Sequence, residues 1–218
     1  MRMRMFEALA TAAFACLPIV PARAQPAGSG SPPAIVYTAR LLPMNTAVTG
    51  REASGEARFT VAGDTLTVSI TARGVAPGIT HWQHFHGFRD NRDASCPAPA
   101  ADVNHDGIID LIETEPAVGT TMVPFQDNPA SMQVMRDTYP KAAADGTYEY
   151  RKTVSLKALT AAFAKAFGGQ PLDLDRRVVI IHGVPPATRL PMSAASLGAV
   201  PAQVTVPVAC GKMERVAP

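Results

Sequence analysis

The residues best suited to chemistry form one acidic segment, residues 102–113, with the sequence DVNHDGIIDLIE. Oxygen-bearing side chains stand at its positions 1, 3, 5, 9 and 12, and a glycine that permits a sharp turn stands at position 6. This spacing matches the twelve-residue loop whose oxygens surround Ca²⁺. The predicted calcium ligands are Asp102, Asn104, Asp106, Ile108 (through its carbonyl), Asp110 and Glu113. The alternative is a solvated acidic turn that holds no metal.

Prolines flank this acidic segment on both sides. Pro97 and Pro99 precede it and rule out an ordinary entering helix, and Pro116 is expected to stop any exiting helix within a turn. The sequence contains no second loop of this kind with which the segment could pair. We therefore interpret the segment as a structural clamp on a β scaffold and not as half of a calcium sensor.

A second candidate site lies in the run HWQHFH, residues 81–86. Residues two apart on a strand project from one face, so His84 and His86 can share a metal ion, whereas His81 faces the other way. His182 lies in a hydrophobic stretch, where an imidazole needs a partner. Three neutral imidazoles without a thiolate suit copper or zinc. The alternative is a set of hydrogen-bonded structural histidines.

Short alternating segments predict the elements that position these residues. Strands are expected at 35–42, 55–61, 65–72, 120–125, 148–154, 177–184 and 203–209, and in the histidine run. One helix is expected at 156–167, with Ser155 as its cap and two glycines at its end. Met132 and Met135 are interpreted as ordinary surface or core residues and not as soft copper ligands. Many strands and one short helix predict an all-β, mostly antiparallel sandwich or barrel.

The N-terminal residues predict export. Arg2 and Arg4 precede an apolar stretch at 8–20, and a small-x-small site ends at Ala24, so residues 1–24 are expected to be a signal peptide cleaved after Ala24. The apolar stretch is too short to span a bilayer, and no later stretch approaches that length. A flexible leader at 25–33, one β domain at 34–213 and a tail at 214–218 are expected to follow.

Charge and cysteine content narrow the class of protein. Removal of residues 1–24 takes away three arginines and one glutamate, which leaves 17 of the 20 basic and 17 of the 18 acidic residues. No basic block survives, so no nucleic-acid partner is expected. Cys96 and Cys210 are then the only cysteines. An even pair in an oxidising compartment indicates a disulfide, and the alternative is two buried free thiols.

The histidine run and several landmarks after it resemble a known family. Residues 81–90, HWQHFHGFRD, resemble the copper-binding strand of the Cu/Zn superoxide dismutases, whose pattern reads HGFHVHEFGD. Cys96 comes shortly afterwards, His182 lies far downstream, and ACG at 209–211 resembles the family's closing Ala-Cys-Gly. The landmarks agree in order over most of the chain, while identity is confined to short stretches.

The resemblance implies an eight-stranded Greek-key sandwich, here with a long calcium-loop insertion, and a disulfide between the two cysteines. It implies that His81 is a structural, hydrogen-bonded residue. The implied copper ligands are His84, His86 and His182, with His105 as a candidate fourth. The expected function is that of an exported metal-binding protein that holds calcium and copper.

Two departures from the family bear on activity. The family's zinc loop supplies three histidines and an aspartate, whereas residues 96–125 contain only His105, so the zinc site is expected to be absent. The family's active-site arginine corresponds to Pro207, for which Arg89 and Arg92 are candidate substitutes. At most a copper-only dismutase activity is expected, and copper storage or delivery is the alternative.

The opening strands carry a second resemblance. Residues 37–41 and 55–59, YTARL and GEARF, are similar to the CHRD, or chordin-type, domains of exported bacterial proteins. The function this implies is a non-catalytic structural or adhesion module of the envelope, stabilised by calcium and the disulfide. Metal ions are the expected partners under either interpretation.

Overall fold

Nine β-strands dominate residues 33–217, the part of the chain that the computed structural model describes. The predicted signal peptide and most of the predicted leader lie outside these residues. The strands are β1 (Ile35–Pro43), β2 (Ser54–Ala62), β3 (Thr65–Arg73), β4 (Gln83–Gly87), β5 (Thr120–Pro124), β6 (Tyr148–Ser155), β7 (Val178–His182), β8 (Pro207–Lys212) and β9 (Glu214–Arg215). The helices are α1 (Thr46–Thr49), α2 (Leu111–Val118), α3 (Leu156–Ala166) and α4 (Ala202–Thr205). Three single 3-10 turns are η1 (Pro99–Ala101), η2 (Pro129–Ser131) and η3 (Leu174–Arg176). None of the helices in this part is long and apolar enough to cross a membrane.

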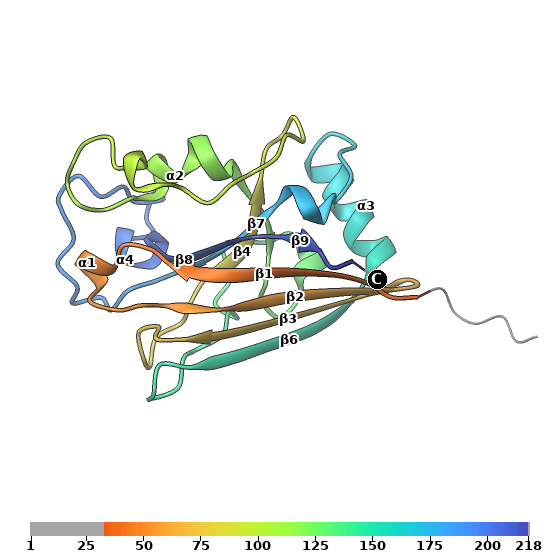
Figure 1. Cartoon of the computed structure of the whole chain (residues 1–218), viewed down its shortest axis with the longest axis horizontal. Coiled ribbons are helices and arrows are strands. Elements are labelled where there is room, and N and C mark those ends of the chain that lie inside the picture. Colours follow the sequence, from red (N-terminus) through yellow and green to blue (C-terminus); the bar gives the residue numbers. More distant parts are fainter. Residues whose placement is uncertain (1–32, 218) are drawn as a thin grey trace, which may run out of the picture. The chain divides into compact units, whose positions relative to one another are not determined.

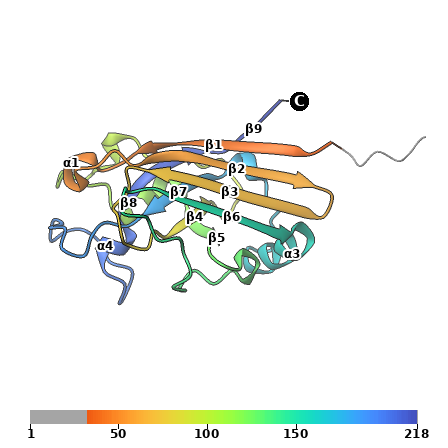
Figure 2. The same cartoon turned by 90° about the horizontal axis from the view of Figure 1, so that it is seen from below.

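The strands form two antiparallel layers joined through β1. The strand order is β5-β4-β7-β8-β1-β2-β3-β6, with β9 paired to β1 (Figures 1 and 2). Most of β1 pairs with β2, but its last residues, Leu42 and Pro43, pair with β8. The connections from β3 to β4, β5 to β6 and β6 to β7 cross between the layers, as in Greek-key sandwiches. The predicted all-β, mostly antiparallel fold class is confirmed.

The core lies between the two layers. Strand alternation turns Phe59 and Ile70 from one layer, and Phe85 and Ile181 from the other, into a common cluster in which each is essentially fully buried. Phe125 packs edge-on against both phenylalanines, with ring centroids 5.3 and 5.9 Å away. The same alternation points the neighbours of Phe85 and Ile181, including the histidines of β4 and β7, to the outer face of their layer.

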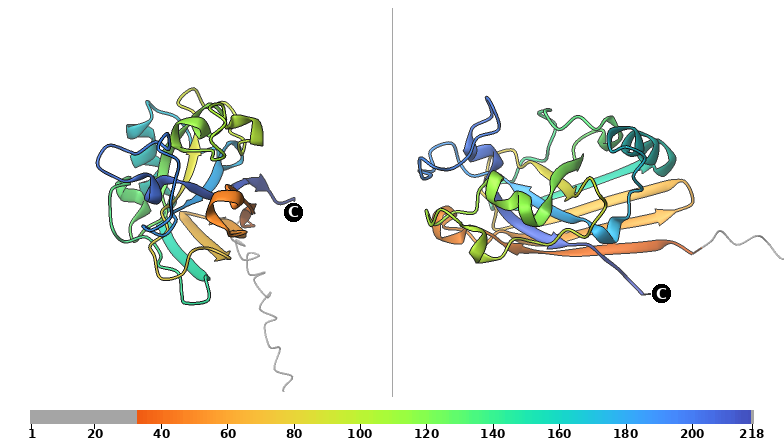
Figure 3. Two further views of the ribbon diagram at one scale, coloured as in Figure 1. Left: turned by 90° about the vertical axis from the view of Figure 1, so that its left-hand side faces the viewer. Right: turned by 90° about the horizontal axis from the view of Figure 1, so that it is seen from above.

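Helix α3 forms where the sequence predicts a helix. Ser155 caps it by accepting a hydrogen bond from the N–H of Ala158 at 3.1 Å, and Leu159 and Phe163 form its buried face. The helix begins beside the β2–β3 turn, because the Leu156 N–H donates to the Asp64 carbonyl. Figure 3 shows it at the end of the sandwich away from α1 and α4.

Two sequence expectations about secondary structure are wrong. Pro116 does not stop the helix after the acidic segment, because α2 runs eight residues with Pro116 inside it. Asp110 and Glu113 form a reciprocal capping box at its start, and the carbonyl that Pro116 leaves unbonded belongs to Ile112, an exposed residue. The expected strand at 203–209 is in fact α4 followed by β8, which begins only at Pro207.

The long connection between β4 and β5 covers the outer face of the β5-β4-β7-β8 layer. Phe88, Ala94 and Val118 from this connection pack on Val178 and Ile180 of β7. The predicted disulfide is confirmed, since Cys96 of the connection is bonded to Cys210 of β8. The expected tail is part of the sheet at its start, because β9 pairs with β1.

A buried arginine explains one glycine in this layer. Arg177 is fully buried, and its guanidinium donates to the carbonyls of Pro171 and Leu172 and to the Asn91 side chain. A Cβ at Gly87 would lie 2.6 Å from Arg177 Nη1, which leaves no room for a side chain there. Gly87 therefore lets the end of β4 pass over the guanidinium directly after His86.

Candidate metal centre

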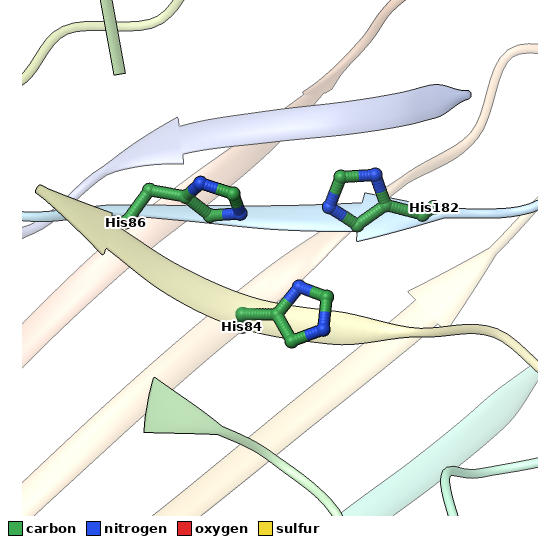
Figure 4. Close-up of side chains that lie close together, drawn as sticks. All are labelled: His84, His86 and His182. Atoms are coloured by element: carbon green, nitrogen blue, oxygen red, sulfur yellow. The ribbon is translucent and has the colours of Figure 1, made fainter. Parts of the chain in front are cut away.

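Three histidines predicted as ligands meet on the outer face of neighbouring strands. His84 and His86 lie on β4, His182 ends β7, and the antiparallel pairing sets His84 opposite Ile180. One ring nitrogen from each histidine lies within 4.8 Å of the other two. Figure 4 shows the three rings on the same side of the two strands. A point therefore exists that is about 2.8 Å or less from each of these three nitrogens. That distance is a little above the ~2.0–2.1 Å of metal–imidazole bonds.

Most ring nitrogens of this histidine triad (His84, His86 and His182) have no hydrogen-bond partner. All three side chains are buried, and both nitrogens of His84, both of His86 and Nε2 of His182 have no hydrogen-bond partner. His182 Nδ1 lies 2.7 Å from the Thr205 carbonyl, which can only accept, so Nδ1 carries the proton and Nε2 a free lone pair. Buried polar atoms are nearly always satisfied. A bound cation would use the lone pairs left free here.

Burial keeps the triad neutral. It lowers the pKa of His86 to about 3, with the proximity of His182 as a smaller contribution. It lowers the pKa of His182 to about 4, against the opposing effect of the Thr205 carbonyl. The pKa of His84 is also well below its ordinary value, through burial and then the two neighbouring imidazoles. Neutral imidazoles are the form that binds metal ions.

Aromatic and aliphatic side chains far apart in the sequence wall the triad. Trp82 and Tyr139 stack on each other, and both meet the His84 ring edge-on. A small hollow above His84 and His182 is lined by residues that include Thr205, Leu111, Thr121, Val134 and Leu197. Sequence reasoning missed these wall residues. Only Trp82, in the histidine run, and Leu111, in the acidic segment, belong to recognised motifs.

His81 lies on the opposite face, as the alternation of the strand predicts. Its Nδ1 is 2.9 Å from the His182 carbonyl and its Nε2 is 2.9 Å from the Ala76 carbonyl. The ring stacks on Tyr148 with centroids 5.9 Å apart. Burial lowers its pKa, and the two carbonyls oppose that effect. His81 therefore has the structural, hydrogen-bonded position that the family resemblance implies, and it fixes the backbone of His182.

His105, the candidate fourth copper ligand, is not brought to the triad. It is exposed in the acidic segment, and its backbone is left-handed with φ of 59°. Its side chain is not a member of the histidine group. Position 4 of a calcium-type loop points away from the loop centre, and here it points to solvent.

No basic side chain lines the hollows at the triad. Arg92 forms an ion pair with Asp90 at 2.6 Å and lies over the Phe88 ring, and Arg89 lies over Phe167. Both arginines line a pocket of about 610 Å³. This pocket shares four lining residues with a cavity that reaches His86, but neither arginine lines that cavity. Pro207, where the family has arginine, pairs with His182 in the sheet. Neither candidate substitute is positioned at the triad.

The acidic segment is closed by its own backbone. Asp102 accepts hydrogen bonds from the N–H groups of Asp106 and Gly107, and Glu113 accepts from those of Val103 and Asp110. In the described residues, only the histidine triad brings three potential ligand atoms within 4.8 Å of one another. The carboxylates of the acidic segment lie farther apart, and two of them, those of Asp106 and Asp110, accept hydrogen bonds from outside the loop.

The carboxylates of Asp106 and Asp110 bind the segment that precedes α4. The Ser193 hydroxyl donates to Asp106, and the Ala195 N–H donates to Asp110 Oδ2 at 2.7 Å. A cation in the acidic segment would compete for these same oxygens. The predicted calcium ligands thus lie in one loop, with Asp110 and Glu113 also capping α2.

Comparison with known proteins gives a distant structural match. No family model matches this chain, and no curated protein matches it. A solved structure, described as a double mutant of a SOD-like protein from Bacillus subtilis, matches 80% of this chain and 95% of its own. The sequence identity is 17% and the TM-score 0.41. The likeness concerns the fold alone and assigns no ligand to this chain, and the CHRD relation stays a prediction.

Proposed function

We propose that this protein binds a copper ion through His84, His86 and His182. The observation that carries the proposal is the convergence of three buried, neutral imidazoles with five ring nitrogens that have no partner. Leaving such groups unsatisfied costs free energy, about 1–3 kcal/mol for each buried polar group. A metal bound at three of these nitrogens offsets that cost, which explains why a hydrophobic layer retains them.

The donor set favours copper or zinc among the common metals. Three imidazoles without thiolate, carboxylate or water-rich surroundings suit copper or zinc and disfavour calcium and magnesium. When bound, copper supplies the capacity to accept or release one electron. The chain's own residues hold the site: the Thr205 carbonyl fixes the His182 tautomer, and His81 fixes the His182 backbone. We propose binding of copper for storage or delivery, because neither Arg89 nor Arg92 lines the hollow over the triad or the cavity at His86.

Metal analysis and EPR spectroscopy of the purified full chain test this proposal. We expect close to one copper per chain after reconstitution and a Cu²⁺ spectrum with nitrogen hyperfine coupling. Replacing His84 and His86 by alanine removes the signal, whereas His105→Ala, an exposed histidine outside the triad, leaves it unchanged. A spectrum that persists without His84 and His86 would show that the copper binds elsewhere.

We also propose that the acidic segment binds Ca²⁺. Its support is the match of the segment to the twelve-residue template, together with the closed loop around Asp102 and Glu113. Excess chelator is expected to lower the melting temperature of the wild type but not that of Glu113→Gln. Equal melting of the wild type with calcium and with chelator contradicts this proposal. Such a result leaves the copper proposal untouched.

Export is the proposed location. Its support is the sequence pattern of residues 1–24 and the Cys96–Cys210 disulfide, since disulfides persist in oxidising compartments. Expression of the full chain in a bacterial host, with mass measurement of the product, tests it. We expect cleavage after Ala24 and recovery outside the cytoplasm, and an uncleaved product in the cytoplasm contradicts the proposal.

A further inference from the structure

A surface cavity leads to the triad. It has a volume of about 360 Å³, and His86 forms part of its floor. The small hollow over His84 and His182, about 20 Å³, has four of its lining residues in common with this cavity. They are Leu111, Thr121, Val134 and Leu197. The cavity and the hollow therefore adjoin along one wall, and the cavity is the open side of the site.

The mouth of this cavity is apolar and carries one negative charge. Ile112, Met135 and Leu197 line it and are 65%, 63% and 43% exposed. Glu115 is the only acidic or basic residue in the lining besides His86. The adjoining 610 Å³ pocket adds Arg89, Asp90 and Arg92, so the charges around the mouth sum to zero and do not favour a small anion. This balance is compatible with the entry of a cation.

Met135 is held at this mouth by the site's own wall. The Val134 carbonyl, directly before it, accepts hydrogen bonds from the Tyr139 hydroxyl and the Arg136 N–H, each at 2.9 Å. Tyr139 is also the residue whose ring meets His84 at 5.5 Å. The thioether of Met135 is the only sulfur in the cavity lining. Its exposure leaves the sulfur free to meet an incoming ion.

The charge of the site bears on the valence of the ion. The three imidazoles are neutral, and no carboxylate joins them within the group. The cost of moving an ion out of water rises with the square of its charge, so a buried site without an anionic ligand penalises a divalent ion most. A thioether selects Cu⁺, and imidazoles suit copper among other metals.

We propose that this cavity admits copper as Cu⁺, with the Met135 thioether as the first ligand before transfer to the triad. The inference rests on the proposed copper site and names the form of its cargo and its route. The ion passes from the sulfur to His86, the triad member in the cavity, and then to all three imidazoles. No electron is transferred in this sequence, because copper enters and binds as Cu⁺.

Anaerobic transfer of Cu⁺ from a coloured bicinchoninate complex to the metal-free full chain tests this route. Met135→Leu keeps the size and apolar character of the side chain but removes the sulfur. Met192→Leu is the matched control, because Met192 is fully exposed, at 106%, and lies outside the cavity lining. We expect Met135→Leu to load Cu⁺ about tenfold more slowly. The Met192 control loads at the wild-type rate, and Zn²⁺ loading is the same in all three proteins.

The outcomes separate the route from the site. Equal Cu⁺ loading by Met135→Leu and wild type overturns the route, as does an equal slowing of Zn²⁺ loading, which would indicate a general packing effect. Failure of the wild type to take Cu⁺ while it gives the Cu²⁺ spectrum also overturns the route, whereas copper uptake that persists without His84 and His86 overturns the copper site itself. Circular dichroism melting confirms that the compared proteins are equally folded.

Discussion

Acid should unfold the metal-free protein through the triad. In the folded state burial sets the pKa of His86 at about 3 and that of His182 at about 4, and lowers that of His84 well below 6.5. In the unfolded chain each histidine titrates near ~6.5. Below that pH the unfolded state binds protons that the folded state does not. The stabilisation is therefore complete above pH ~6.5 and is lost as the pH falls toward the folded values.

The expected size is large. One proton taken up only by the unfolded state changes the free energy of unfolding by ~1.4 kcal/mol per pH unit. Three triad histidines together remove roughly 3 kcal/mol between pH 6.5, where the unfolded histidines are half protonated, and pH 5.5, and roughly 4 kcal/mol over the next unit. Typical domains have about 5–15 kcal/mol in all, so a metal-free protein is expected to be near its limit at pH 5.

Urea unfolding of the metal-free chain between pH 7.5 and 5.5 measures this dependence, with Trp82, the single tryptophan, as the fluorescent probe. His86→Gln is expected to reduce the slope against pH by about one proton, or ~1.4 kcal/mol per unit. His105→Gln is the control, because His105 is exposed and should not change the slope. A wild-type slope of less than one proton, or an unchanged slope in His86→Gln, would refute the reasoning. Saturating copper should raise the free energy of unfolding across this range without changing the slope, because the folded triad is already unprotonated there.

Three further predictions concern stability. Replacing Cys96 and Cys210 by alanine opens a crosslink between residues 114 apart and should lower the free energy of unfolding by ~5 kcal/mol in the chain-entropy model, as measured by urea unfolding. Gly87→Ala places a methyl group against Arg177 Nη1 and should cost about 1–3 kcal/mol, and a variant melting at the wild-type temperature would show that the arginine moves freely. Ser155→Ala removes the α3 cap and should cost about 1 kcal/mol by the same assay.

Strand periodicity was enough to predict much of the layered fold and half of the site. Alternation alone places His84 and His86 on one face and His81 on the other, because side-chain direction in a strand has a period of two. It does not place His182, since the pairing of β4 with β7 joins segments about a hundred residues apart, and only the family resemblance linked them. The disulfide followed from the cysteine count and the compartment.

The wall and the entrance were beyond the reach of local patterns. Tyr139, Val134 and Leu197 come from irregular segments, and no periodicity marks them. Met135 was interpreted as an ordinary residue because its spacing from other methionines shows no pattern. Its proposed role depends on its position in the lining of the cavity at His86, which the sequence does not reveal. The end of α2 was misjudged because proline rules are weaker where the carbonyl left without a partner belongs to an exposed residue such as Ile112.

The Cys96–Cys210 bond has a consequence for the integrity of the site under proteolysis. It closes a covalent ring that contains β5, β6 and β7, so His182 lies inside the ring, while His84 and His86 lie on the chain before it. The largely exposed segment at 185–200 is inside the same ring and is the kind of loop that proteases cut. A single cut there leaves both fragments in one molecule. The first fragment carries all three histidines, and the second carries Thr205 and β8, which contact His182. These contacts survive the break in the backbone, and only a reductant releases the second fragment.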